Sequence, residues 1–300
     1  MIYTVTLNPS IDYVVQLEEL QLFELNYMDR DLKLPGGKGI NVSRILHELQ
    51  IDTTAFGFIG GFTGDFIVDW LERDGIRTQF TPIQHDTRIN IKLKTNPETE
   101  INSKGPMIQP HEAKALVKQL ESITEDDFVI FSGSKPPSLP EDFYETLIQK
   151  SNAPFAMDTT GKDLQTALSY QPFLVKPNLQ ELEQLFSVTL EHQEDIIPYG
   201  KKLIASGAKH AIVSMGGDGA LLFTENAVYR GVSPKGELKN SVGAGDSMVA
   251  GFIGEYVKTK DVVQAFKMGL AAGSATAFSY DLAKADDIFA LLEQVEIIER

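Results

Sequence analysis

The chain of 300 residues contains no cysteine, a single tryptophan and comparatively few basic residues. Without cysteine, disulfide bonds, thiolate nucleophiles and cysteine-ligated metal sites are excluded. Lys and Arg number 27 against 42 Asp and Glu, so the net charge is −15, which argues against nucleic acid and anionic membrane as partners. An anionic ligand would need local cations. Lys38, Arg88, Lys92 and Lys94 are the candidates, unless they are ordinary solvated charges.

Long hydrophobic runs are also missing. No apolar stretch approaches the ~20 residues that a membrane helix requires. Residues 1–7 lack the basic region and cleavage site of a signal peptide and are typical of a first β-strand. We therefore expect a cytoplasmic protein without membrane contact. Hydrophobic residues still make up 42% of the chain, which is enough for a sizeable core.

The chain alternates short β-rich runs with amphipathic helical segments. Strands are expected at residues 2–7, 54–59, 128–132, 155–158, 173–176 and 210–215. Helices are expected at 39–49, 110–121, 141–150, 179–186, 195–206, 248–259 and 262–278. This alternation predicts an α/β fold in which a doubly wound, mainly parallel sheet carries helices on both faces. Ligands of such sheets bind at the carboxyl ends of the strands. Trp70 lies in a helical apolar pattern and is predicted to be in the core.

Two segments, residues 13–34 and 88–102, interrupt the alternation. The second is a period-2 strand followed by a turn at Pro97 and another short strand. One face of that strand carries Arg88, Asn90, Lys92 and Lys94, and the other carries aliphatic residues. We expect a small sheet that projects from the core. Its polar face suits a lid over a phosphorylated sugar, or it is the ordinary solvent-facing side of an antiparallel sheet.

The segment at residues 241–247 places three small residues, Gly243, Ala244 and Gly245, before Asp246 at the start of an apolar helix. Free N–H groups and the positive end of the helix dipole favour a phosphate or a developing oxyanion there. Asp246 would then hold the hydroxyl that attacks phosphorus. The alternative is an acidic residue that only stabilises the helix end.

Two motifs near the N-terminus suit hydroxyl groups. Gly36 and Gly37 permit close backbone approach, Lys38 offers a point charge for phosphate, and Asn41 offers a donor and an acceptor. Asp12 follows the first strand and would accept hydrogen bonds from sugar hydroxyls. The alternatives are a glycine turn with a solvated lysine, and an Asx-turn that ends the strand.

Two later motifs suit a nucleotide. Lys176 and Asn178 would approach its phosphates, and Glu181 would help to hold hydrated Mg²⁺. Asn178 and Glu181 equally match a helix capping box. The run from Ser214 through Gly216, Gly217 and Gly219 could lie flat against a nucleotide, or it could be a hairpin turn.

Taken together, these motifs resemble the ribokinase-like PfkB carbohydrate kinases nearly from end to end. The resemblance implies one kinase domain over residues 1–300 with a discontinuous β-lid from about 13–34 and 88–103. The 6–12 and 36–43 segments look like the branch that phosphorylates sugar phosphates, 1-phosphofructokinases and tagatose-6-phosphate kinases. The 87–92 segment is more similar to the 1-phosphofructokinases. The chain departs from the family pattern at Tyr27 and Lys135.

The resemblance also implies roles for individual residues. Asp246 is the catalytic base, with Gly243, Ala244 and Gly245 as the anion hole. The implied sugar-phosphate ligands are Asp12, Gly36, Gly37, Lys38, Asn41, Arg88 and Asn90. The implied ATP ligands are Lys176, Asn178, Ser214, Gly216, Gly217 and Gly219, with Glu181 acting through Mg²⁺. In this family the lid often also forms a homodimer contact.

The expected activity is therefore ATP-dependent phosphorylation of fructose 1-phosphate to fructose 1,6-bisphosphate. Tagatose 6-phosphate is the alternative acceptor. A non-catalytic sensor of sugar phosphate or nucleotide on the same scaffold is the rival from another functional class.

Overall fold

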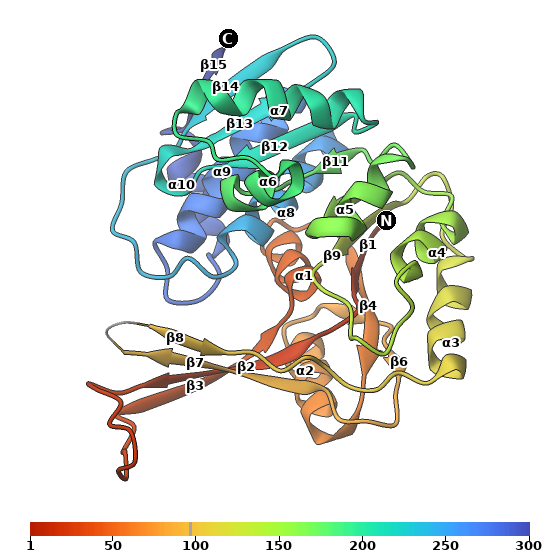
Figure 1. Ribbon diagram of the computed structural model, residues 1–300, viewed down its shortest axis with the longest axis vertical. Coiled ribbons are helices and arrows are strands. Elements are labelled where there is room, and N and C mark those ends of the chain that lie inside the picture. The colour runs from red at the N-terminus through yellow and green to blue at the C-terminus, as the bar shows by residue number, and fades with distance from the viewer. Residues whose placement is uncertain (96–97) are drawn as a thin grey trace.

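The computed structural model describes residues 1–95 and 98–300 and is built around a large sheet. Eleven strands form this sheet, in the order β15-β14-β13-β12-β11-β10-β9-β1-β4-β5, with β6 also paired to β4. All pairs from β12 to β5 are parallel, and the β12-β13-β14-β15 end is antiparallel. Helices cover both faces of the sheet, and the C-terminus lies at its antiparallel end (Figure 1).

The strands of the large sheet are short. They are β1 Ile2–Thr6, β4 Thr53–Ile59, β5 Arg77–Thr78, β6 Thr81–Pro82, β9 Phe128–Ser132, β10 Phe155–Asp158, β11 Leu174–Val175, β12 His210–Ser214, β13 Ala220–Phe223, β14 Val228–Val232 and β15 Glu296–Glu299. The helices are α1 Lys38–Glu48, α2 Gly61–Arg73, α3 Pro110–Leu120, α4 Phe143–Lys150, α5 Gly161–Leu168, α6 Leu179–Phe186, α7 Gln193–Ala205, α8 Ala244–Thr259, α9 Val262–Ala277 and α10 Ala285–Leu292.

Two hydrophobic layers, one on each face of the sheet, explain why the sequences of these strands are nearly continuous apolar runs. In β9, Val129 and Phe131 pack against the layer that includes α3 to α7, and Phe128 and Ile130 pack against the layer that includes α1, α8 and α9. A parallel strand covered on both faces needs apolar residues at successive positions, not only at alternate ones. The predicted α/β fold class is confirmed.

A second sheet of four strands stands apart from the first, in the order β3-β2-β7-β8. Its strands are β2 Ser10–Gln16, β3 Arg30–Gly36, β7 Arg88–Lys94 and β8 Thr99–Ile101. The central pair, β2 with β7, is parallel and joins segments nearly eighty residues apart in the sequence. This small sheet extends away from the body as an arm (Figure 1).

Some elements differ from expectation. Asp12 does not end the first strand but lies inside β2, whose pairing with β3 and β7 comes from distant segments that local patterns cannot reveal. Trp70 is only half-buried, with Nε1 donating to the Asp74 carboxylate at 3.1 Å, because it lies at the edge of the apolar face of α2. The predicted turn at Pro97 lies outside the described residues. Within them, no helix combines the length and apolar character needed to cross a bilayer.

One glycine is required by the packing of the central strands. Gly57 pairs with Thr6, has a φ of 144°, and a Cβ there would lie 1.9 Å from the Thr6 carbonyl oxygen. We expect Gly57→Ala to lower the free energy of unfolding by about 3 kcal/mol or more, because backbone strain adds to a clash with a paired strand.

Urea unfolding followed by circular dichroism measures this loss. The matched control is Gly161→Ala, at a φ of 61° with no atom within 4 Å of the added Cβ. Backbone strain alone predicts a loss of about 1 kcal/mol there. Equal losses in the two variants would contradict the steric explanation.

Candidate active site

The polar side chains singled out in the sequence converge at the carboxyl edge of the parallel strands. The chain leaves β1 for β4 on one side and later returns to β9 on the other, so strand order reverses at β1. Open α/β sheets bind ligands outside such a reversal point. A cavity of about 1200 Å³ lies there. Its walls include Asp12, Gly37, Lys38, Asn41, Arg88, Asn90, Lys176, Asn178, Glu181, Ser214, Gly216, Gly217, Gly243, Ala244, Gly245 and Asp246.

Helix α8 presents its N-terminus to this cavity without a cap. Gly243 precedes the helix in the left-handed region, with a φ of 82°, and no side chain caps the first turn. Among the described residues, the N–H groups of Gly245 and Asp246 have no hydrogen-bond acceptor. Exposed amides at the positive end of the helix dipole form an anion site. The predicted helix start at 248 was too late, because the small residues at 244–247 are themselves helical.

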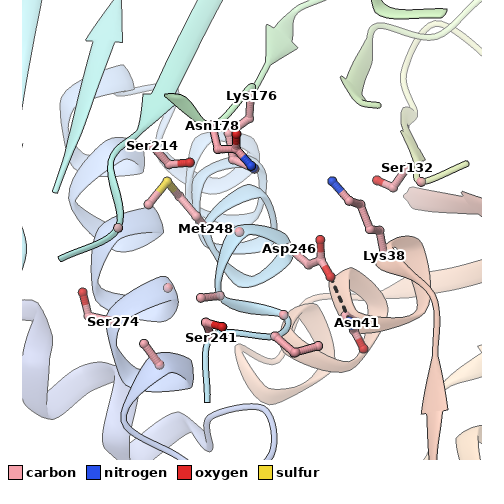
Figure 2. Close-up of a pocket in the computed structure, with 18 of the residues that line it drawn as sticks. Lys38, Asn41, Ser132, Lys176, Asn178, Ser214, Ser241, Asp246, Met248 and Ser274 are labelled. Atoms are coloured by element: carbon pink, nitrogen blue, oxygen red, sulfur yellow. Dashed lines mark hydrogen bonds between the residues drawn. The ribbon is translucent and has the colours of Figure 1, made fainter. Parts of the chain in front are cut away.

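Asp246 stands beside these amides and is only 6% exposed. Its Oδ2 accepts a hydrogen bond of 2.8 Å from Nδ2 of Asn41 across the space between α8 and α1 (Figure 2). Burial raises the pKa of Asp246 to about 6, although the nearby ammonium of Lys38 acts to lower it. Asn41 therefore fixes one carboxylate oxygen, and Oδ1 is left to meet a substrate hydroxyl.

Two lysines from opposite sides of the cavity share one buried carboxylate. Lys38 Nζ lies 3.2 Å from Oδ1 of Asp158, and Lys176 Nζ lies 3.6 Å from the same atom. Burial would raise the pKa of Asp158, but Lys176 and Lys38 hold it below its ordinary value. Lys38 also lies 3.9 Å from Glu181. Both ammonium groups therefore lie beside the anion site, and Lys176 Nζ is 3.0 Å from where a Cβ on Gly245 would lie.

Sequence reasoning missed Asp158. The sequence pattern places Asp158 only at the end of a strand, and a charge at the end of a buried strand is the signal that could identify it. Asp158 is aligned with Ser132 and Thr6 on the neighbouring strands. Each of these three side chains has a buried oxygen without a hydrogen-bond partner in the described residues: Asp158 Oδ2, Ser132 Oγ and Thr6 Oγ1. Buried unpaired oxygens are costly and mark this edge as a place for water or ligand.

The small sheet supplies the other end of the cavity. Asp12 Oδ1 accepts from Ser10 Oγ at 2.8 Å and from Asn90 Nδ2 at 3.1 Å. The remaining face of the Asp12 carboxylate is open to the cavity. Gly36 lies behind it and does not line the cavity, but a Cβ there would come within 2.5 Å of the Asp12 carboxyl carbon. Gly36 therefore makes room for the carboxylate.

Most of the N–H donors of Arg88 bond to backbone carbonyl groups. Its Nε and Nη2 donate to the carbonyl of Asn8 at 3.1 and 2.9 Å, and Nη1 donates to the carbonyl of Ser103 at 2.7 Å. Three of its five N–H donors are thus used, which leaves two for a ligand.

The nucleotide motifs lie at the opposite end. Asn178 Oδ1 accepts from the N–H of Glu181, and Glu181 Oε2 accepts from the N–H of Asn178, both at 2.8 Å. The capping-box interpretation is therefore confirmed, and both side chains still border the cavity. Ser214, Gly216 and Gly217 line it as well, in the turn that joins the antiparallel β12 and β13.

Gly219 has a different place from the one expected. It does not line the cavity, and a Cβ there would lie 2.0 Å from the carbonyl oxygen of Gly231, so it allows close approach of β14. Lys135, a departure from the family pattern, is also outside the cavity wall and forms an ion pair with Asp163 at 2.5 Å. Tyr27, the other departure, is exposed on the loop between β2 and β3.

The arrangement provides a carboxylate for a hydroxyl, backbone amides for an anion, and two ammonium groups between them. Transfer of a phosphoryl group needs these parts: positioning of the nucleophile and stabilisation of charge on the transferred oxygens. Across residues 1–95 and 98–300, no cluster of three or more His, Asp or Glu side chains could hold a metal ion on its own.

The whole chain is similar to known carbohydrate kinases. Residues 5–286 match the pfkB family of carbohydrate kinases. A 1-phosphofructokinase of Bacillus subtilis (strain 168) is 48% identical over 300 residues, which cover 99% of both chains. A D-tagatose-1-phosphate kinase of Bacillus licheniformis is 36% identical over 301 residues, again with 99% of both chains covered.

A solved structure supports the same family assignment. Phosphofructokinase-2 from Escherichia coli, in complex with fructose-6-phosphate, superposes with a TM-score of 0.91 at 28% identity, with 98% of both chains covered. The family resemblance seen in the sequence is thereby confirmed. The chain belongs to the pfkB family of carbohydrate kinases and is a phosphotransferase whose acceptor is a carbohydrate hydroxyl.

Proposed function

We propose that this kinase transfers the γ-phosphoryl group of ATP to fructose 1-phosphate, which gives fructose 1,6-bisphosphate. The observation that carries the proposal is the uncapped N-terminus of α8 with the buried Asp246 carboxylate beside it. The 48% identity to a relative named 1-phosphofructokinase, over essentially the full chain, supports this substrate.

In this mechanism Asp246 accepts the proton of the attacking hydroxyl. Its pKa of about 6 makes it a better base than an ordinary carboxylate, and it remains ionised at neutral pH. The N–H groups at the start of α8 take the charge on the equatorial oxygens of the transferred group, which is spread out in a loose transition state. No covalent intermediate on the protein is needed.

The sugar fits between the small sheet and α1. Asp12, Asn90, Gly37 and Asn41 would receive its hydroxyls, and Arg88 would meet its existing phosphate with its two free N–H groups. The sequence alone suggested that Lys38 meets the same phosphate. Its contacts with Asp158 and Glu181 favour a different role, so we infer that Lys38 and Lys176 stabilise the phosphoryl group in transfer.

The residues present fit a magnesium ion carried by ATP. Hard cations such as Mg²⁺ prefer oxygen ligands and keep several waters. Asp158 Oδ2 has no partner in the described chain, and Glu181 Oε1 is not used by the capping box and lies 3.9 Å from Lys38 Nζ. These two carboxylates would hold the water shell of Mg²⁺, and the ion would supply positive charge to the phosphates of ATP.

Two other functions are alternatives to this one. The 36% identical D-tagatose-1-phosphate kinase keeps a tagatose phosphate open as an alternative acceptor. A non-catalytic sensor is less well supported, because a sensor has no need of a buried base held by Asn41. Side-by-side kinetics with fructose 1-phosphate and the tagatose phosphates rank the acceptors.

We also propose a homodimer formed through the small sheet. The loop between β2 and β3 exposes a set of large apolar side chains: Leu20, Leu22, Phe23, Leu25, Tyr27 and Met28. Asn26 holds this loop in shape, since its side chain bonds to Gln21 and Glu24 backbone groups at 2.7 to 2.9 Å. Ile89 on β7 and Ile101 on β8 are also exposed on the small sheet. A preformed apolar surface of this kind marks an interaction site.

A coupled assay of ADP release with fructose 1-phosphate tests the activity. We expect Asp246→Asn to reduce kcat by about 10³-fold or more, because the hydroxyl loses its proton acceptor. The substitution removes a buried charge, so the melting temperature should not fall, and fructose 1-phosphate should still raise it. Unchanged kcat in this variant would overturn the assignment of the base.

The pKa of Asp246 predicts that kcat/KM falls at acid pH. Below pH about 6 the carboxylate takes up a proton, so kcat/KM should fall as pH falls and be level above it. The sugar phosphate itself titrates near pH ~6, and the control is therefore Asn41→Ala. Loss of the donor to Oδ2 should move the midpoint upward. A midpoint that stays in place would mean that the substrate, and not Asp246, causes the fall.

The dimer is tested by light scattering after size-exclusion chromatography. We expect the wild-type chain at twice its 33.2 kDa mass and the double variant Leu22→Glu, Phe23→Glu as a monomer, because charges on the apolar loop oppose burial. Phe289→Glu is the control, since this exposed phenylalanine lies on α10, outside the small sheet. A monomeric wild type would refute the proposal.

A further inference from the structure

The inward face of the small sheet carries a lysine that the proposed site does not yet use. Arg88, Asn90 and Lys92 alternate along β7 and all border the large cavity, together with Asp12. The Lys92 side chain is only 12% exposed. Its Nζ donates to Glu100 Oε2 at 2.6 Å and to Asn102 Oδ1 at 3.1 Å. An ammonium has three donors, so one remains for a ligand in the cavity.

The charges at this end of the cavity cancel when the cavity holds no substrate. Arg88 faces Asp12, which acts on it electrostatically, and Lys92 faces Glu100. A sugar phosphate brings close to two negative charges into a chain whose net charge is already −15. Arg88 has only two donors left and cannot balance that charge alone.

The two members of the Lys92–Glu100 pair differ in burial. Glu100 lies on the short strand β8 with its side chain 46% exposed, so it can turn into solvent at little cost. Burial would raise the pKa of Glu100, but its hydrogen bond from Lys92 holds it below its ordinary value. The carboxylate is therefore charged at neutral pH and competes with any anion for the ammonium.

We propose that Lys92 binds the phosphate already carried by the sugar, and that Glu100 occupies this ammonium until the phosphate displaces it. The inference rests on the proposed function and names a specificity determinant within it. A sugar without a phosphate cannot displace Glu100, so the pair selects for phosphorylated acceptors as well as binding them.

The chain offers a matched control further along β7. Lys94 pairs with Glu98 at 3.0 Å on the same face of the sheet, with side chains 28% and 64% exposed. Neither residue borders the large cavity; both line a neighbouring one of about 330 Å³. The two lysine–glutamate pairs share their chemistry and differ in access to the sugar.

The test measures KM for fructose 1-phosphate and for ATP in Lys92→Met, Glu100→Gln, Lys94→Met and Glu98→Gln. We expect Lys92→Met to raise KM for the sugar phosphate at least 10-fold and to leave KM for ATP within 3-fold. Glu100→Gln should lower KM for the sugar phosphate 2- to 5-fold, and inorganic phosphate should inhibit it more strongly than the wild type. The two control variants should stay within 2-fold.

An unchanged KM for the sugar phosphate in Lys92→Met overturns the role of Lys92. An unchanged or raised KM in Glu100→Gln overturns the displacement, because Glu100 would then only orient Lys92. Glu100 is half-exposed, so Glu100→Gln remains informative even if Lys92→Met does not fold. If wild-type protein neither phosphorylates fructose 1-phosphate nor gains melting temperature from it, the proposed function fails. If it does both and the variants match it, only this inference fails.

Discussion

The central physical constraint on this molecule is that a chain with a net charge of −15 must bind two phosphorylated ligands at one edge of a sheet. Lysine side chains alone do not supply enough positive charge, because Lys38 and Lys176 lie beside three carboxylates. These belong to Asp158, Glu181 and Asp246. The backbone supplies what is missing. The N-terminus of α8 is left uncapped behind Gly243, so its amides and dipole add positive potential without adding charge. Helix α6, which also begins at this edge, is capped by the side chains of Asn178 and Glu181 and contributes less.

This arrangement is unfavourable for the fold in the absence of ligand. Within the described residues, the N–H groups of Gly245 and Asp246 have no acceptor, and Asp158, Ser132 and Thr6 each keep a buried oxygen unpaired. Asp246 is itself buried and has a raised pKa. Each such group costs free energy that the two hydrophobic layers must offset. Sites that are prepared for a charged transition state commonly carry this cost.

Much of this could be predicted from the sequence, and the failures share a cause. Apolar runs and helical periodicity are local, so the strands of the parallel sheet and most helices were predicted within a few residues, and the small glycine-rich segments marked the anion site. Asp12 was misplaced because β2 exists only through pairing with β3 and β7. Asp158 was missed because its importance comes from two lysines that lie 120 and 18 positions away in the chain. Pairings between distant segments leave no periodic pattern in the amino-acid sequence.

The separation of the small sheet from the main body divides the contacts proposed for the acceptor between two parts of the molecule. Asp12 and Asn90 belong to the small sheet, whereas Asp246 and the amides of α8 belong to the body. A nucleotide that arrives alone meets the amides but has no alcohol aligned against its terminal phosphorus. Water in that place would lack the hydrogen bonds to Asp12 and Asn90 that orient a sugar. Under the proposed function, the two-part construction would protect ATP from wasteful hydrolysis and tie its turnover to the presence of the correct acceptor.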